Sequence, residues 1–168
     1  MPEAVLPGSF NPLHHGHTSL ARAAAVRLGA DVHFELSVVN ADKPELPRDE
    51  VERRVKQFAD VGPVWVTRAA TFGAKADLFP GAAFVLGWDT AVRVIDPKYY
   101  GGAVGRDAAL RKLADRGCRL VVGGRVDRGG AFRLWDGSGL SAEFAPLFVA
   151  LTEADFRADV SSTQLRGE

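Results

Sequence analysis

The sequence predicts a Rossmann-like α/β domain built on a doubly wound parallel sheet. Short apolar runs alternate with helical patterns through residues 4–124, an order typical of βαβ units. The 168 residues, 46% of them apolar, are enough for one sizeable core, which favours a single domain over 1–168. Basic and acidic residues balance at 21 each, so phosphate binding is expected to be local rather than spread over a polyanion-binding surface.

Each element follows from a local pattern. Strands are expected at 4–8, 32–39, 64–68, 82–87, 119–124 and 148–156, and helices at 17–30, 48–60 and about 106–116. In the first helix Leu20, Ala24 and Leu28 share a face, and Gly29 is placed to end it. Residues 124–136 read as a strand, a glycine turn and a second strand, which predicts a small β-hairpin insertion at the sheet edge.

Composition excludes several classes of site. Cys118 is the only cysteine, so neither an internal disulfide nor a cysteine-based zinc site is possible. Arg22 and Arg27 interrupt the small-residue run of the first helix, and no export signal precedes it, so we expect a cytoplasmic protein without a membrane partner. No basic stripe with stacking aromatics is present, which argues against nucleic acid as a partner. A homo-oligomer remains open.

The stretch GSFNPLHHGH, residues 8–17, is the first candidate site. It follows the carboxyl end of the first predicted strand, where open α/β sheets bind ligands, and it leads into a helix whose free amides and dipole attract phosphate. His14 and His17 are three residues apart and project the same way if both join the first helical turn. A plain turn and a zinc site are the alternatives. Zinc is disfavoured because no glutamate lies between the histidines and no third ligand is evident.

The stretch VSSTQLR, residues 160–166, is the second candidate site. Ser161, Ser162 and Thr163 offer hydroxyls and successive amides at a helix start, and Arg166 offers a guanidinium fork for phosphate oxygens. The alternative is a capping box, because Ser161 and Gln164 have the required spacing.

Together the two stretches resemble the GxFxPxHxGH and ISSTxIR segments of the nucleotidyltransferase superfamily that includes the nicotinamide and nicotinate mononucleotide adenylyltransferases. The first match falls on Gly8, Phe10, Pro12, His14, Gly16 and His17. The resemblance implies transfer of a nucleotidyl group from ATP to a phosphate-bearing acceptor, most closely a pyridine mononucleotide, with release of pyrophosphate. It also implies small-molecule nucleotides as partners and Mg²⁺ carried by the triphosphate.

The resemblance assigns residues to three roles. The catalytic residues are His14, His17 and Arg166. The residues expected at ATP and its phosphates are Gly8, Ser9, Phe10, Gly16, Gly87, Asp89, Ser161, Ser162 and Thr163. The residues expected near the acceptor are Asn40, Lys43, Arg54, Thr71, Phe72 and Arg125. Asp89 and Arg54 also have simpler interpretations. An aspartate after a strand is often only a helix cap, and an arginine on a helix is often only a solvated side chain.

The sequence leaves two other functions open, another transferase of the same fold and a non-catalytic nucleotide-binding module. A transferase of the same fold would use CTP, or another acceptor such as phosphopantetheine. A nucleotide-binding module that senses without turnover is the alternative from a different class, and the short stretch after Arg166 leaves open that the chain is a piece of a longer protein.

Overall fold

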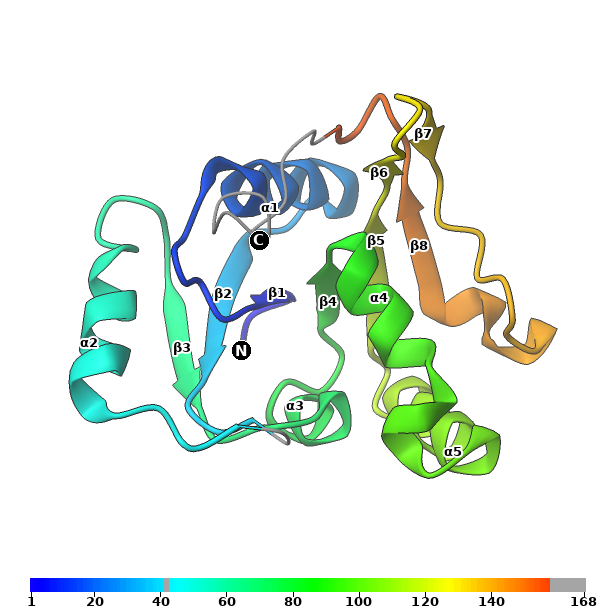
Figure 1. Cartoon of the computed structure of the whole chain (residues 1–168), viewed down its shortest axis with the longest axis horizontal. Helices are drawn as coiled ribbons and strands as arrows, with labels where there is room; N and C mark the ends of the chain where they lie inside the picture. The colour runs from blue at the N-terminus through cyan, green and yellow to red at the C-terminus, as the bar shows by residue number, and fades with distance from the viewer. Residues whose placement is uncertain (41–42, 158–168) are drawn as a thin grey trace.

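The computed structural model describes residues 1–40 and 43–157 (Figure 1). Within these residues the strands of the main sheet are β1 (Ala4–Pro7), β2 (Val32–Ser37), β3 (Val64–Thr67), β4 (Ala83–Leu86), β5 (Arg119–Gly123) and β8 (Phe148–Leu151). They pair in the order β3-β2-β1-β4-β5-β8, and every pairing is parallel. The predicted doubly wound α/β fold is therefore confirmed.

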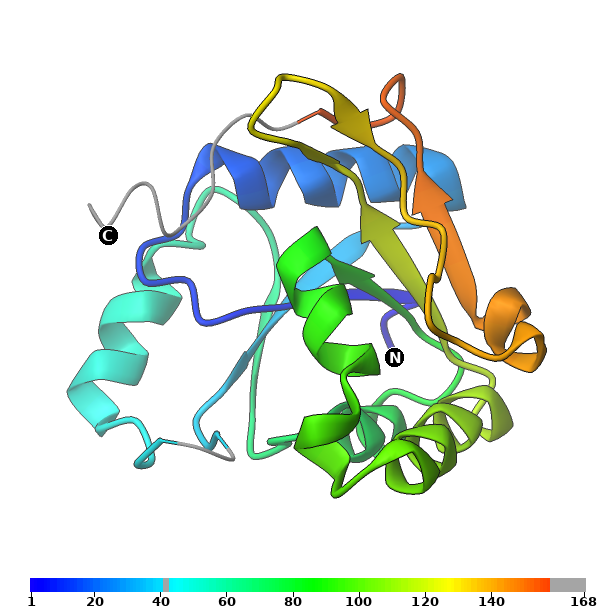
Figure 2. The ribbon, with the colours of Figure 1, turned by 45° about the vertical axis from the view of Figure 1, so that its right-hand side comes forward.

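Helices cover both faces of the sheet. They are α1 (His15–Leu28), α2 (Arg48–Lys56), α3 (Phe72–Leu78), α4 (Trp88–Ile95) and α5 (Ala103–Asp115), with 3-10 turns η1 (Pro97–Tyr100) and η2 (Ala142–Leu147). Alternate strand residues supply two separate cores: Leu6 and Val85 pack with α1, whereas Phe84 and Leu120 pack with α3, α4 and α5. Figure 2 shows α1 well apart from α5.

The predicted hairpin is also confirmed. Strands β6 (Arg125–Val126) and β7 (Phe132–Arg133) pair antiparallel and lie beyond the end of β5 (Figure 2). Asp127 closes the turn, because its Oδ1 accepts the N–H groups of Gly129 and Ala131 at 2.9 and 3.0 Å.

Some predicted boundaries were wrong, and two helices were missed. Helix α1 begins at His15, before the predicted start, and Gly29 ends it in the left-handed conformation as expected, at φ 65°. Helix α2 stops at Lys56, and β8 stops at Leu151, because Asp155 then accepts from Thr152 and turns the chain. Helices α3 and α4 have 7 and 8 residues, too few turns for a clear periodicity.

The strand order creates a switch point at β1. The chain runs outward from β1 to β2 and β3, then crosses back to β4 on the other side of β1. Ala4 pairs with Ala83 and Val5 with Phe84, so β1 and β4 end side by side. The segments that follow them, residues 8–14 and 87–89, therefore leave the sheet together at the place where such folds bind ligands.

Among the described residues, no helix combines the length and apolar character needed to cross a membrane.

Candidate functional site

His14 and His17 cap the N-terminus of α1 reciprocally. His14 is the N-cap residue, and its Nδ1 accepts the backbone N–H of Gly16 at 3.1 Å. The Nδ1 of His17 accepts the backbone N–H of His14 at 3.2 Å. Because each Nδ1 accepts a hydrogen bond, each neutral ring carries its proton on Nε2. In each ring, therefore, Nδ1 caps the helix, and Nε2–H is the group that can donate a hydrogen bond to a ligand.

The electrostatics of the pair favour neutral rings. Burial, with a smaller contribution from the neighbouring His14, lowers the pKa of His17 to about 4. Burial also lowers the pKa of His14, with a smaller contribution from His15. The two ring centroids lie 3.8 Å apart. Two neutral Nε2–H donors at a helix N-terminus stabilise a developing negative charge without adding a fixed positive charge to the resting site.

Phe10 shapes the loop that precedes these histidines. Its backbone is left-handed, at φ 45°, and its side chain is completely buried. The ring meets His17 edge-on at 5.1 Å between centroids, and it packs against Phe34 and Phe58 at 5.7 and 5.0 Å. Burial of this aromatic cluster offsets the cost of the unusual turn. Gly8 is required beneath it, since a Cβ there would stand 2.8 Å from the Phe10 ring.

Helix α2 holds the same loop through polar side chains. The Nη1 of Arg54 donates to the Ser9 carbonyl at 2.8 Å, and Arg53 donates to Asn11 Oδ1 at 2.7 Å. Glu50 accepts from both arginines, whose hydrogen bonds lower the pKa of this carboxyl to about 2. Arg54, expected near the acceptor, is therefore a buried side chain that holds the loop by a hydrogen bond. Sequence reasoning missed Arg53, whose only signal was its place beside Arg54.

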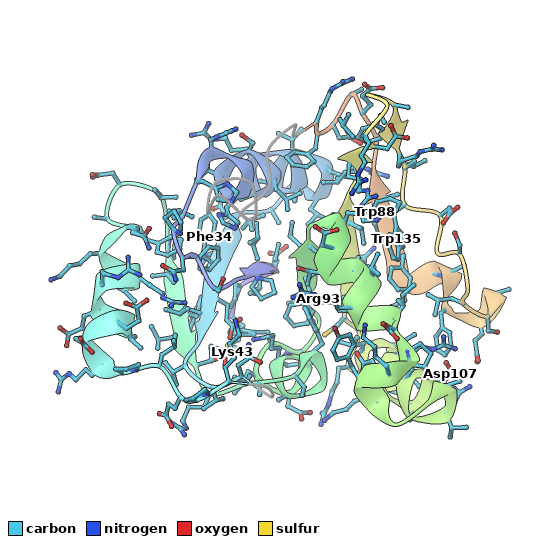
Figure 3. All side chains as sticks on the ribbon, viewed as in Figure 1. Phe34, Lys43, Trp88, Arg93, Asp107 and Trp135 are labelled. Carbon is cyan, nitrogen blue, oxygen red and sulfur yellow. The ribbon has the colours of Figure 1, made fainter. Side chains whose placement is uncertain are left out.

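Three predicted residues, Gly87, Asp89 and Arg125, come together at the end of β4. Gly87 is the N-cap of α4, and a Cβ there would meet nothing within 4 Å, so this turn faces open space. Asp89 lies in the first helical turn, with its side chain 73% exposed, and Arg125 approaches its carboxylate at 3.5 Å. The Arg125 guanidinium also stands 5.6 Å from the centre of the Trp88 ring. Figure 3 shows Trp88 beside Trp135, between α4 and the β8 region.

The other residues expected near the acceptor take varied positions. Thr71 caps α3 by accepting the Ala74 N–H at 3.2 Å, and Phe72 packs edge-on against Phe84. Asn40 and Lys43 form an isolated antiparallel bridge after β2, and in Figure 3 Lys43 lies on the α3 side of the molecule, away from Trp88. Ser161, Ser162, Thr163 and Arg166 lie outside the described residues.

A buried ion pair supports the loop between β3 and α3. The Lys75 Nζ lies 2.7 and 2.9 Å from the carboxylate oxygens of Glu35 and donates to the Ala69 carbonyl at 2.8 Å. Thr67 donates to the same carboxylate at 2.5 Å. All three Nζ protons are used, so the pair is a structural tie rather than a free charge. Sequence reasoning missed it, because neither residue lies in a recognisable motif.

The described residues contain no cluster of three histidine, cysteine, aspartate or glutamate side chains suited to hold a metal ion.

Comparison with known proteins adds one finding to this geometry. The sequence profile of one family, described as cytidylyltransferase-like, matches residues 5–168. The match covers nearly the whole chain and includes both the histidine stretch and residues 160–166. No curated protein matches the chain.

Proposed function

The chain belongs to the cytidylyltransferase-like family of nucleotidyltransferases, and we propose that it transfers the adenylyl group of ATP to a pyridine mononucleotide and releases pyrophosphate. The GSFNPLHHGH and VSSTQLR stretches support ATP and this acceptor class. The family description favours CTP as the second candidate donor, and phosphopantetheine is the second candidate acceptor.

One observation carries the proposal. The reciprocal cap occupies Nδ1 of both histidines, so both Nε2–H groups are donors at the N-terminus of α1. This helix begins at the switch point between β1 and β4, where the sheet favours a bound ligand. Paired imidazole donors, the positive end of the α1 helix dipole and an open turn at Gly87 together suit a nucleotide triphosphate.

The reaction needs no protein nucleophile. A phosphate oxygen of the acceptor attacks the α-phosphorus of ATP in line, a new P–O bond forms, and the bond to the departing pyrophosphate breaks. We assign His17 to the α-phosphate as charge develops there, and His14 to the bridging oxygen and the leaving pyrophosphate. Mg²⁺ enters with the triphosphate as part of the substrate.

The remaining residues complete the proposal. Asp89 hydrogen-bonds the nucleotide ribose, and Gly87 leaves room for it to approach. The side chains proposed for the β- and γ-phosphates are Ser161, Ser162, Thr163 and Arg166. The acceptor side is proposed to involve Asn40, Lys43, Arg54, Thr71, Phe72 and Arg125, with Arg54 acting through the loop that it holds.

Pyrophosphate release tests the proposal. The purified chain is incubated with Mg²⁺ and either ATP or CTP, against nicotinamide mononucleotide, nicotinate mononucleotide and phosphopantetheine in parallel. Release with ATP and one pyridine mononucleotide is expected. Release only with CTP would replace ATP as the donor. Release only with phosphopantetheine would replace the pyridine mononucleotide as the acceptor. ATP binding without any release would favour a sensing module.

A further inference from the structure

Gln57, the C-cap residue of α2, bridges the two sides of the turn at the phosphate site. Its Nε2 donates to the Phe10 carbonyl at 3.0 Å, and its Oε1 accepts the Leu13 N–H at 2.9 Å. The same Nε2 also lies 3.1 Å from the Arg54 carbonyl, which fixes the amide on its own helix. One side chain, 44 residues or more away in sequence, thus satisfies both a carbonyl and an amide of the loop.

These bonds matter because the loop lacks a regular ladder of its own. Residues 8–14 lie between β1 and α1, and they pass through the left-handed turn at Phe10. Backbone groups in such a turn need partners from elsewhere in the fold. Helix α2 stands beside this loop in both Figure 1 and Figure 2, and Gln57 provides the partners on each side of the turn.

A short chain of contacts links this amide to the histidine pair. The Phe10 carbonyl and the Phe10 ring belong to one residue, so the hydrogen bond from Gln57 constrains the backbone from which the ring extends, and the ring lies close to Gly8 on one side. On the other side the ring meets His17 edge-on, 5.1 Å between centroids. The titratable neighbour of His17 in this contact is His14, whose ring lies 3.8 Å away.

We infer that Gln57 is a positioning residue for the histidine pair: its amide ties the Phe10 carbonyl to the Leu13 N–H, and this holds the Phe10 ring over His17. The effect on catalysis rests on the proposed nucleotidyl transfer, whereas the effect on the environment of His17 does not. Gln57 itself touches neither His14 nor His17 through any hydrogen bond that it makes to the loop, so it acts through Phe10.

Gln57→Met tests the inference, because methionine keeps the length of the side chain and removes both hydrogen bonds to the loop together with the one to the Arg54 carbonyl. Lys56→Met is the matched control, since Lys56 is the exposed neighbour at the same end of α2. Gln57→Ala is a second variant that cannot crowd the loop. The pKa of His17 is followed by NMR titration of its ring, and the KM for ATP is measured separately from kcat.

In folded Gln57→Met and Gln57→Ala, we expect the pKa of His17 to rise from about 4 toward 6.5, because the Phe10 ring no longer shields it. The KM for ATP should rise by about tenfold, on the scale of one or two lost hydrogen bonds, and Lys56→Met should change neither quantity. A His17 pKa and a KM that stay unchanged while only thermal stability falls would overturn the inference. Loss of folding in both Gln57 variants would also overturn it, by making Gln57 a purely structural residue.

The two readouts separate this inference from the proposed function. The NMR titration needs no substrate, so a raised His17 pKa in a protein without transferase activity would support the positioning role and contradict the proposed function. Transferase activity that does not depend on Gln57, with an unchanged His17 pKa, would support the proposed function and contradict the positioning role.

Discussion

The Nδ1 of His17 accepts the backbone N–H of His14 at 3.2 Å, so the second histidine of the motif caps the helix that the first one begins. The return bond runs from the Gly16 N–H to His14 Nδ1. These backbone contacts at Nδ1 favour the same tautomer, with the proton on Nε2, in both neutral rings. In the proposed function, the nucleotide would therefore meet imidazole rings whose orientation is set before it binds.

Two substitutions of His17 distinguish its role as a helix cap from its proposed role as a hydrogen-bond donor to the nucleotide. His17→Ala should lower kcat by on the order of 100-fold or more, the scale of one lost preorganised donor. It should also lower stability by about 1 kcal/mol, because the His14 N–H loses its partner. His17→Gln should restore the stability, since glutamine at this position accepts the same N–H, but not kcat. Steady-state kinetics and urea unfolding measure the two effects.

His15→Ala is the matched control, because His15 is exposed and lies between the two capping residues. Near-normal turnover in His17→Ala would remove His17 from the mechanism.

Stability should fall in mild acid because of His17. Its pKa is about 4 in the folded chain against a usual 6.5, so between these pH values the unfolded chain binds more protons. The free energy of unfolding should therefore decrease as pH falls from 6.5 to 4, by up to about 3 kcal/mol from this group. His14 adds to the same trend, since burial lowers its pKa too. Urea unfolding from pH 4 to 7 measures the slope, and an equal slope in His17→Gln would refute this origin.

Gly8→Ala should destabilise the loop. The added methyl group would stand 2.8 Å from the Phe10 ring, and that ring is enclosed by Phe34 and Phe58. Such overpacking costs about 1–3 kcal/mol. Thermal unfolding should show a melting temperature lower by several degrees, about 2–4 °C for each kcal/mol. An unchanged melting temperature would mean that the ring moves away freely.

Gly87→Ala, in contrast to Gly8→Ala, should leave stability nearly unchanged and weaken ATP binding. A Cβ there meets nothing within 4 Å, and the backbone φ of −72° suits alanine, so stability should change by only a few tenths of a kcal/mol. The methyl group would occupy the space through which the nucleotide is proposed to approach. ATP binding by calorimetry should weaken by about tenfold, which corresponds to about 1.4 kcal/mol. Unchanged binding would place the nucleotide elsewhere.

The Glu35–Lys75 pair should be costly to break and tolerable to remove. Lys75→Met leaves a fully buried carboxylate without its cation and should cost about 3–5 kcal/mol. Glu35→Leu together with Lys75→Met buries no charge and should recover more than half of that loss. Denaturant unfolding of the three proteins measures both steps. A double variant as unstable as the single one would assign the cost to packing.

The sequence by itself determined the elements with strong local patterns. Apolar runs between helical patterns were enough to predict the parallel sheet, and the glycine turn was enough to predict the hairpin at 124–136. The spacing of His14 and His17 predicted that both would project the same way if they joined the first helical turn, and in the structure His14 is the N-cap and His17 lies in the first turn of α1. These features depend on neighbours within a few residues, so the local chain carries the information.

Only the tertiary structure decided how the loop is held and shielded. Arg54 and Gln57 reach Ser9, Phe10 and Leu13 across more than 40 residues of sequence, and no local pattern distinguishes them from solvated side chains of a helix. The short helices α3 and α4, likewise, exist through burial against the sheet rather than through their own periodicity. Contacts between distant segments arise from packing, and packing also decides which polar side chains in this chain become buried supports.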